Sequence, residues 1–179
     1  MAKAKHWLLA VELLHAMSRR NLRLCVPFFG CAINACRKRG QWQASLALLE
    51  EMSSAKLRSD TITCSSAISS CENAGQWLAA IGLMREMVAR ALELDTITYS
   101  AVISACEKGG QWLAALDQLG SMLGASVQAN TITFSAAISA CEKCGQWLAA
   151  LALLSEMADR RVERNVITFN AAISACDKS

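Results

Sequence analysis

Apolar residues recur along the chain at helical spacing, in blocks that polar or glycine-rich segments separate. In one such block, Ile103 and Cys106 lie on one face of a predicted helix, which Gly109-Gly110 ends. A second helix is predicted from about Gln111 to Met122, and the polar connection Gly124–Asn130 follows it. The pattern therefore predicts pairs of helices joined by short turns.

The whole pattern repeats every 35 residues. Three residue types mark the period most clearly: Trp7, Trp42, Trp77, Trp112 and Trp147; Met17, Met52, Met87, Met122 and Met157; Cys36, Cys71, Cys106, Cys141 and Cys176. In this frame a half repeat covers 1–25, four complete repeats cover 26–60, 61–95, 96–130 and 131–165, and a half repeat covers 166–179. We expect a threonine to be the N-cap of each first helix, at Thr63, Thr98, Thr133 and Thr168.

Each predicted helix pair has an apolar face that only a neighbouring pair can cover, so the units must stack. The expected fold is all-α, a superhelical solenoid of stacked helix-turn-helix repeats. Composition agrees, because 54% of the 179 residues are apolar and proline and tyrosine each occur once, at Pro27 and Tyr99. No run of about 18 uninterrupted apolar residues occurs, so no membrane span is expected.

Charge adds little to this picture. The net charge is +3, and residues 1–60 carry ten Lys and Arg against four Asp and Glu. A solvated helical surface explains this distribution as well as contact with nucleic acid does.

Candidate chemistry is sparse. The recurring cysteines suit small core residues that stay reduced, and no signal peptide is evident. Cys141 and Cys144 have the spacing of half a metal or redox site, but the other half is absent. His6 and His15 have no nearby nucleophile or third ligand, and Glu107 recurs only as part of the repeat. We therefore expect no catalytic centre, no metal site and no cofactor.

Residues 131–157, Thr-Ile-Thr-Phe-Ser-Ala-Ala-Ile-Ser-Ala-Cys-Glu-Lys-Cys-Gly-Gln-Trp-Leu-Ala-Ala-Leu-Ala-Leu-Leu-Ser-Glu-Met, closely resemble the pentatricopeptide repeat. The resemblance lies in Thr-aromatic-Ser opening the first helix, Cys-x-Lys-x-Gly closing it, and Ala-Leu-x-Leu-x-x-x-Met in the second helix, and it covers essentially the entire chain. It implies a right-handed superhelical solenoid that binds single-stranded RNA in a mitochondrion or plastid, one base per repeat. Some members of the family carry an enzymatic tail, and no such segment is present in these residues.

The resemblance also implies which residues read the bases: the fifth and the last residue of each repeat. The pairs are Ser65 with Asp95, Ser100 with Asn130, and Ser135 with Asn165, while Asn170 opens a repeat whose partner is missing. The second residues, expected to clamp the bases, are Ile62, Ile97, Ile132 and Ile167. Asp only accepts hydrogen bonds, as guanine requires, and Asn both donates and accepts, as adenine requires. The family's code then gives a 5′-G-A-A-3′ core.

A lysine before each turn resembles the family's phosphate-contacting position, at Lys38, Lys108, Lys143 and Lys178. The first complete repeat departs from the pattern, since it pairs Asp60 with Gly30 and has Pro27 as its clamp. We expect this repeat to read poorly. The second complete repeat has Asn73 in place of the lysine.

Both ends of the frame are half repeats without a polar cap. We expect Ala171, Ala172, Ile173 and Cys176 to face solvent, unless the chain is a fragment of a longer array or its ends dock on another molecule. This leaves two alternatives to base reading: a structural subunit of a large organellar assembly, and a helical adaptor for a peptide or protein client. Base reading predicts purine-selective RNA binding, whereas a scaffold would ignore RNA.

Overall fold

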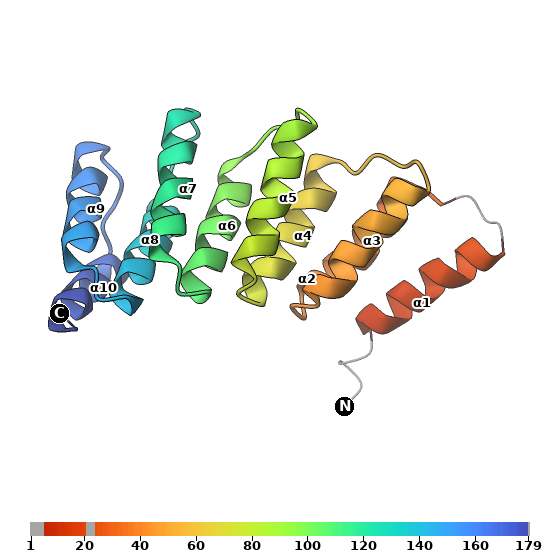
Figure 1. Ribbon diagram of the computed structural model, residues 1–179, viewed down its shortest axis with the longest axis horizontal. Coiled ribbons are helices and arrows are strands. Elements are labelled where there is room, and N and C mark those ends of the chain that lie inside the picture. The colour runs from red at the N-terminus through yellow and green to blue at the C-terminus, as the bar shows by residue number, and fades with distance from the viewer. Residues whose placement is uncertain (1–5, 21–23, 179) are drawn as a thin grey trace.

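The computed structural model describes residues 6–20 and 24–178. These residues form ten α-helices: α1 (His6–Arg19), α2 (Val26–Arg37), α3 (Trp42–Ser54), α4 (Thr61–Asn73), α5 (Trp77–Ala89), α6 (Thr96–Lys108), α7 (Trp112–Gly124), α8 (Thr131–Lys143), α9 (Trp147–Asp159) and α10 (Val166–Asp177). The helices stack as consecutive antiparallel pairs in chain order, with the two termini at opposite ends (Figure 1). The expected all-α solenoid is confirmed.

The helices form two rows. The first helices of the pairs, α2, α4, α6, α8 and α10, each contact the next one in the row. The second helices contact their own partner and the first helix of the following pair. Because successive first helices contact one another and successive second helices do not to the same extent, the first-helix row is the more closely spaced, inner row of the solenoid.

The N-caps of the first helices α4, α6, α8 and α10 lie three residues earlier in the sequence than predicted. The N-caps are Asp60, Asp95, Asn130 and Asn165. Each side chain accepts a hydrogen bond from the backbone N–H of the third helical residue, a threonine, at 2.8–3.0 Å. The prediction of threonine N-caps is therefore wrong, because a carboxylate or amide oxygen one turn earlier meets the unpaired N–H of that threonine.

The turn inside each pair depends on a glycine. Gly40, Gly75, Gly110 and Gly145 adopt φ values between 61° and 66°. This left-handed conformation carries little penalty for glycine and ends the first helix. The second helix of the third complete repeat, α7, starts at Trp112 and ends at Gly124, one residue later at its start and two at its end than predicted.

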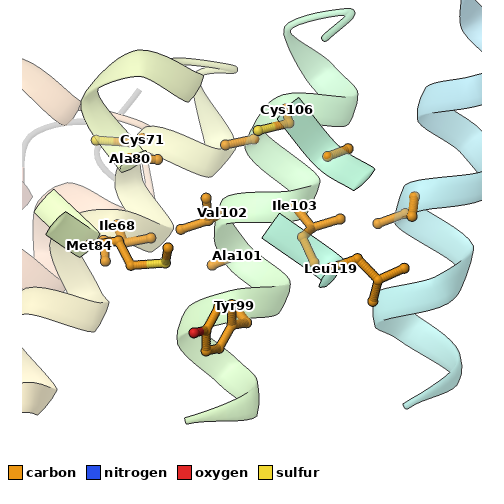
Figure 2. Packing of buried hydrophobic residues seen from close by; sticks show 14 of the residues in the cluster. Ile68, Cys71, Ala80, Met84, Tyr99, Ala101, Val102, Ile103, Cys106 and Leu119 are labelled. Atoms are coloured by element: carbon orange, nitrogen blue, oxygen red, sulfur yellow. The ribbon is translucent and has the colours of Figure 1, made fainter. Parts of the chain in front are cut away.

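The core lies between the two rows and repeats with the sequence (Figure 2). Ile68, Cys71, Ile103 and Cys106 are fully buried. Burial raises the pKa of the thiols of Cys71, Cys106 and Cys141 to about 11. These cysteines therefore pack as small protonated apolar groups.

The expectation that α10 would expose its apolar residues is half right. Ala171 and Ala172 are buried, because α10 packs against α8 and α9. Ile173 and Cys176 are exposed, and Ile173 is 67% exposed where its counterpart Ile138 is fully buried. The open face is the one that a second helix covers in the other repeats.

Among the described residues, no helix combines the length and apolar character that crossing a membrane requires.

Candidate nucleic-acid interface

A row of solvent-exposed isoleucines runs along the first-helix row. Ile62, Ile97, Ile132 and Ile167 are each the second residue of a first helix, and 63–76% of each is exposed. Pro27, which holds the corresponding place in α2, is exposed as well. Exposed apolar side chains at regular intervals, such as these, can pack against flat, partly apolar groups such as nucleobases.

The structure brings the first predicted reading pair together. Ser65 lies on α4, and Asp95 is the N-cap of the next first helix, α6. The two are joined through Thr98, whose Oγ1 lies 2.8 Å from Ser65 Oγ and 2.7 Å from Asp95 Oδ1. Thr98 is fully buried, while Ser65 is half-buried and Asp95 is exposed. A buried hydroxyl thus holds two residues that are far apart in the sequence.

The second pair has the same arrangement. Ser100 Oγ lies 3.0 Å from Thr133 Oγ1, and Thr133 Oγ1 donates to Asn130 Oδ1 at 2.9 Å. Thr133 is also fully buried. The sequence predicts these threonines only as capping residues and does not predict that they link the candidate reading residues.

The third pair lacks this link. Ser135 Oγ donates to the carbonyl of Thr131 at 2.6 Å, and Thr168 Oγ1 donates to the carbonyl of Asn165 at 2.7 Å. Asn170 is exposed on α10, and no first helix follows α10 within the described residues. Of the predicted positions, only the first two pairs are therefore joined by a hydroxyl.

Gly30 lines a cavity of about 820 Å³ between α2 and α4. The cavity is lined by Val26, Pro27, Gly30, Cys31, Asn34, Arg37, Arg58, Asp60, Ile62, Thr63 and Ser66. A Cβ atom added at Gly30 would lie 3.7 Å from Thr63 Oγ1, which is an ordinary contact. The predicted pair of Gly30 and Asp60 therefore has the same backbone arrangement as the other pairs but lacks the serine hydroxyl.

Three of the four predicted phosphate lysines are tied to the preceding repeat. Lys108 pairs with Glu72 at 3.3 Å, Lys143 with Glu107 at 2.7 Å, and Lys178 with Glu142 at 2.8 Å. The hydrogen bond from Lys178 lowers the pKa of the Glu142 carboxyl, and a second hydrogen bond from Ser174 acts in the same direction.

This series of ion pairs links successive repeats, and the two partners of each ion pair lie 36 residues apart in the sequence. The signal was therefore visible as two recurring residues of opposite charge, but its pairing across repeats was not predicted. Asn73, which replaces the lysine in one repeat, donates to the carbonyl of Arg37 at 3.0 Å and makes a similar link. Lys38 forms no ion pair with any residue that the structure describes.

The other candidate groups remain apart from this layer. Cys144 Sγ contacts the carbonyl of Gly110 at 3.4 Å, and Cys141 is buried in the core. His15 Nε2 lies 3.3 Å from Glu51 Oε2. Within residues 6–20 and 24–178, no group of three or more His, Cys, Asp or Glu side chains is placed to hold a metal ion.

Comparison with known proteins places the sequence beside repeat proteins. It matches the PPR repeat family over residues 59–108 and 129–178, and the PPR repeat over residues 28–57 and 97–127. No curated protein matches the sequence.

Two solved structures share the architecture. The chain is similar to the PPR domain of Arabidopsis thaliana protein-only RNase P 1 in complex with tRNA, with a TM-score of 0.80, 13% identity, and coverage of 97% of this chain and 91% of that chain. It is also similar to the pentatricopeptide repeat protein PPR10 in complex with an 18-nt psaJ RNA element, with a TM-score of 0.77, 18% identity, and coverage of 94% of this chain and 25% of that chain. The chain thus spans about a quarter of the length of PPR10. Identities this low show the fold alone.

Proposed function

The chain belongs to the pentatricopeptide repeat family, and from this premise we propose that it binds single-stranded RNA along its first-helix row, one base per repeat. The proposed function is binding and not catalysis. The observation that carries it is the joining of Ser65 with Asp95, and of Ser100 with Asn130, at the edge of a row of exposed isoleucines. Family membership favours a role in the RNA metabolism of a mitochondrion or plastid, which fractionation of organelles would test.

We propose a purine-rich target with a 5′-GAA-3′ core. Asp95 with Ser65 would select guanine, and the two asparagine pairs would select adenine, because only the amide also donates. Each stacked base contributes about 1–3 kcal/mol, so a few well-formed repeats should bind weakly.

Fluorescence anisotropy with the purified chain tests this function directly. Single-stranded RNAs that contain GAA should bind more tightly than matched RNAs that contain CUU and than double-stranded controls. The variant carrying Asn130→Asp and Asn165→Asp should shift the preference from GAA toward GGG. Absence of binding, or equal binding to every RNA, would contradict the proposal.

The ion pairs between repeats make a salt series informative. If all four lysines contact phosphates, log–log plots of affinity against salt should have a slope of about −3, from about −0.7 per contact. If Lys108, Lys143 and Lys178 stay paired with their glutamates, the slope should be near −0.7, from Lys38 alone.

A scaffold role in a large organellar assembly is the second candidate. It is favoured by Leu78, Leu113 and Leu148, which stand 64–68% exposed at the same place on successive second helices. A protein partner could bury this row. In that case the chain would ignore RNA in the anisotropy assay, and Leu113→Ser would release the protein from its assembly without changing its thermal stability.

A further inference from the structure

We propose that Thr98 and Thr133 determine which bases the first two pairs accept, because their buried hydroxyls fix the direction of every hydrogen bond in the pair. This inference rests on the proposed RNA-binding function. Neither threonine needs to touch a base, so both are positioning residues. They act by deciding whether their neighbours present a donor or an acceptor.

The direction of the bonds around Thr98 follows from counting protons. The Asp95 carboxylate only accepts, and it takes one hydrogen bond from the backbone N–H of Thr98 at 2.8 Å and one from its hydroxyl at 2.7 Å. The single proton of the Thr98 hydroxyl is then used. The 2.8 Å contact between Ser65 Oγ and Thr98 Oγ1 must therefore be donated by Ser65.

This arrangement leaves only acceptors for a base. Ser65 has committed its one proton to Thr98 and has lone pairs left, and the second oxygen of Asp95 also only accepts. Guanine presents N1–H and N2–H donors on its Watson–Crick edge and fits two acceptors. Adenine presents an acceptor at N1, which would face another acceptor.

In the pair around Thr133, the N-cap residue Asn130 presents a hydrogen-bond donor to a base, whereas Asp95 presents an acceptor. Asn130 Oδ1 accepts from the backbone N–H of Thr133 at 3.0 Å and from its hydroxyl at 2.9 Å. The amide oxygen is thereby occupied, and the amide nitrogen is the group left to donate. Ser100 gives its proton to Thr133 across 3.0 Å and keeps its lone pairs. One acceptor and one donor match adenine, whose edge carries N6–H and N1.

The chain provides two internal controls. Thr63 Oγ1 donates to Asp60 in the same way as Thr98 does to Asp95, but it faces Gly30, which has no side chain to orient. Thr168 donates to the backbone carbonyl of Asn165, and Ser135 donates within its own helix. Loss of the Thr63 hydroxyl or of the Thr168 hydroxyl should therefore leave base preference unchanged.

The test compares two RNAs that differ only in the first base of the core, GAA and AAA, for the wild-type chain and for Thr98→Val, Thr98→Ser and Thr63→Val. Valine keeps the volume of threonine and removes the hydroxyl, so Ser65 becomes free to donate to adenine. We expect Thr98→Val to reduce the preference for GAA by about tenfold, mainly through tighter binding of AAA. Thr98→Ser keeps the hydroxyl and should keep the wild-type preference for GAA. Thr63→Val removes a corresponding buried hydroxyl, so it should lower the melting temperature about as much as Thr98→Val does, without changing the base preference.

The outcomes separate this inference from the function on which it rests. No selective RNA binding by the wild-type chain would overturn both. Selective binding by the wild type with an unchanged ratio in Thr98→Val, or equal weakening of GAA and AAA, would overturn only the role of the threonine. If Thr98→Val does not fold, Thr133→Val provides the same test. The expected result is then a loss of the preference for adenine over guanine at the second base of the core, and Thr168→Val is the control.

Discussion

Introducing a hydroxyl at Gly30 should create a third pair of reading residues joined by a threonine hydroxyl. The position lies inside α2, where serine is favoured over glycine by about 0.5 kcal/mol, so Gly30→Ser should fold and be slightly more stable. A Cβ atom there lies 3.7 Å from Thr63 Oγ1, which already donates to Asp60. The new hydroxyl could therefore donate to Thr63 in the same way that Ser65 donates to Thr98.

The expected gain is selection of one more base. Repeat 26–60 precedes the repeat that contains Ser65. The introduced serine and the second oxygen of Asp60 would each present one acceptor to the added base, as guanine requires. Gly30→Ser should then prefer GGAA over AGAA by about tenfold, or about 1.4 kcal/mol, the size of one well-placed hydrogen bond. The wild-type chain, with a cavity of about 820 Å³ at this place, should bind the two RNAs equally.

Competition anisotropy with the two four-base cores measures this ratio. Gly30→Ala is the matched control, because it adds the Cβ atom and raises helix propensity by about 1 kcal/mol without adding a hydroxyl. If Gly30→Ser and Gly30→Ala give the same ratio, a hydroxyl bridged to the N-cap is not what selects the base. A rise in affinity for GGAA and AGAA alike would refute the reasoning in the same way.

Three further predictions concern the fold that holds these pairs. Asp95→Ala should cost about 1 kcal/mol in urea unfolding, whereas Asp95→Asn should cost much less, because only the alanine variant leaves the N–H of Thr98 unpaired; equal costs would contradict the capping role. Since the pKa of Glu142 is lowered from 4.5, its contribution to stability should be complete above pH 4.5 and lost as pH falls through the lowered value, and melting curves of Glu142→Gln should lack this step. Cys106, buried and with a pKa of about 11, should resist alkylation at about pH 8, while exposed Cys31 reacts within minutes, as mass spectrometry would show.

Much of the fold could be predicted because one unit of sequence contains one unit of structure. The spacing of Ile103 and Cys106 predicted α6, and Gly110 marked its end. The N-caps were placed wrongly because Asp95 and Thr98 are both good capping residues one turn apart. Sequence alone gives no measure of which side chain reaches the free N–H.

The contacts of the candidate site could not be predicted, because they form between repeats. Glu107 and Lys143 recur with the period, but their 2.7 Å contact depends on how α6 and α8 pack. The same packing decides that Ser100 reaches Thr133, while Ser135 turns back to the carbonyl of Thr131. Identical residues in identical places therefore make different bonds, and only the structure distinguishes them.

Each pair combines a serine on one first helix with an N-cap of the next, so recognition and stacking depend on the same interface. The contact of α4 with α6 both extends the solenoid and places Thr98 between Ser65 and Asp95. A substitution that loosens this contact should therefore weaken base selection at the preceding repeat even when it lies far from the RNA. The converse also follows: a base held by both partners of a pair bridges two repeats, so RNA should stabilise the stack against unfolding in proportion to the number of pairs it engages.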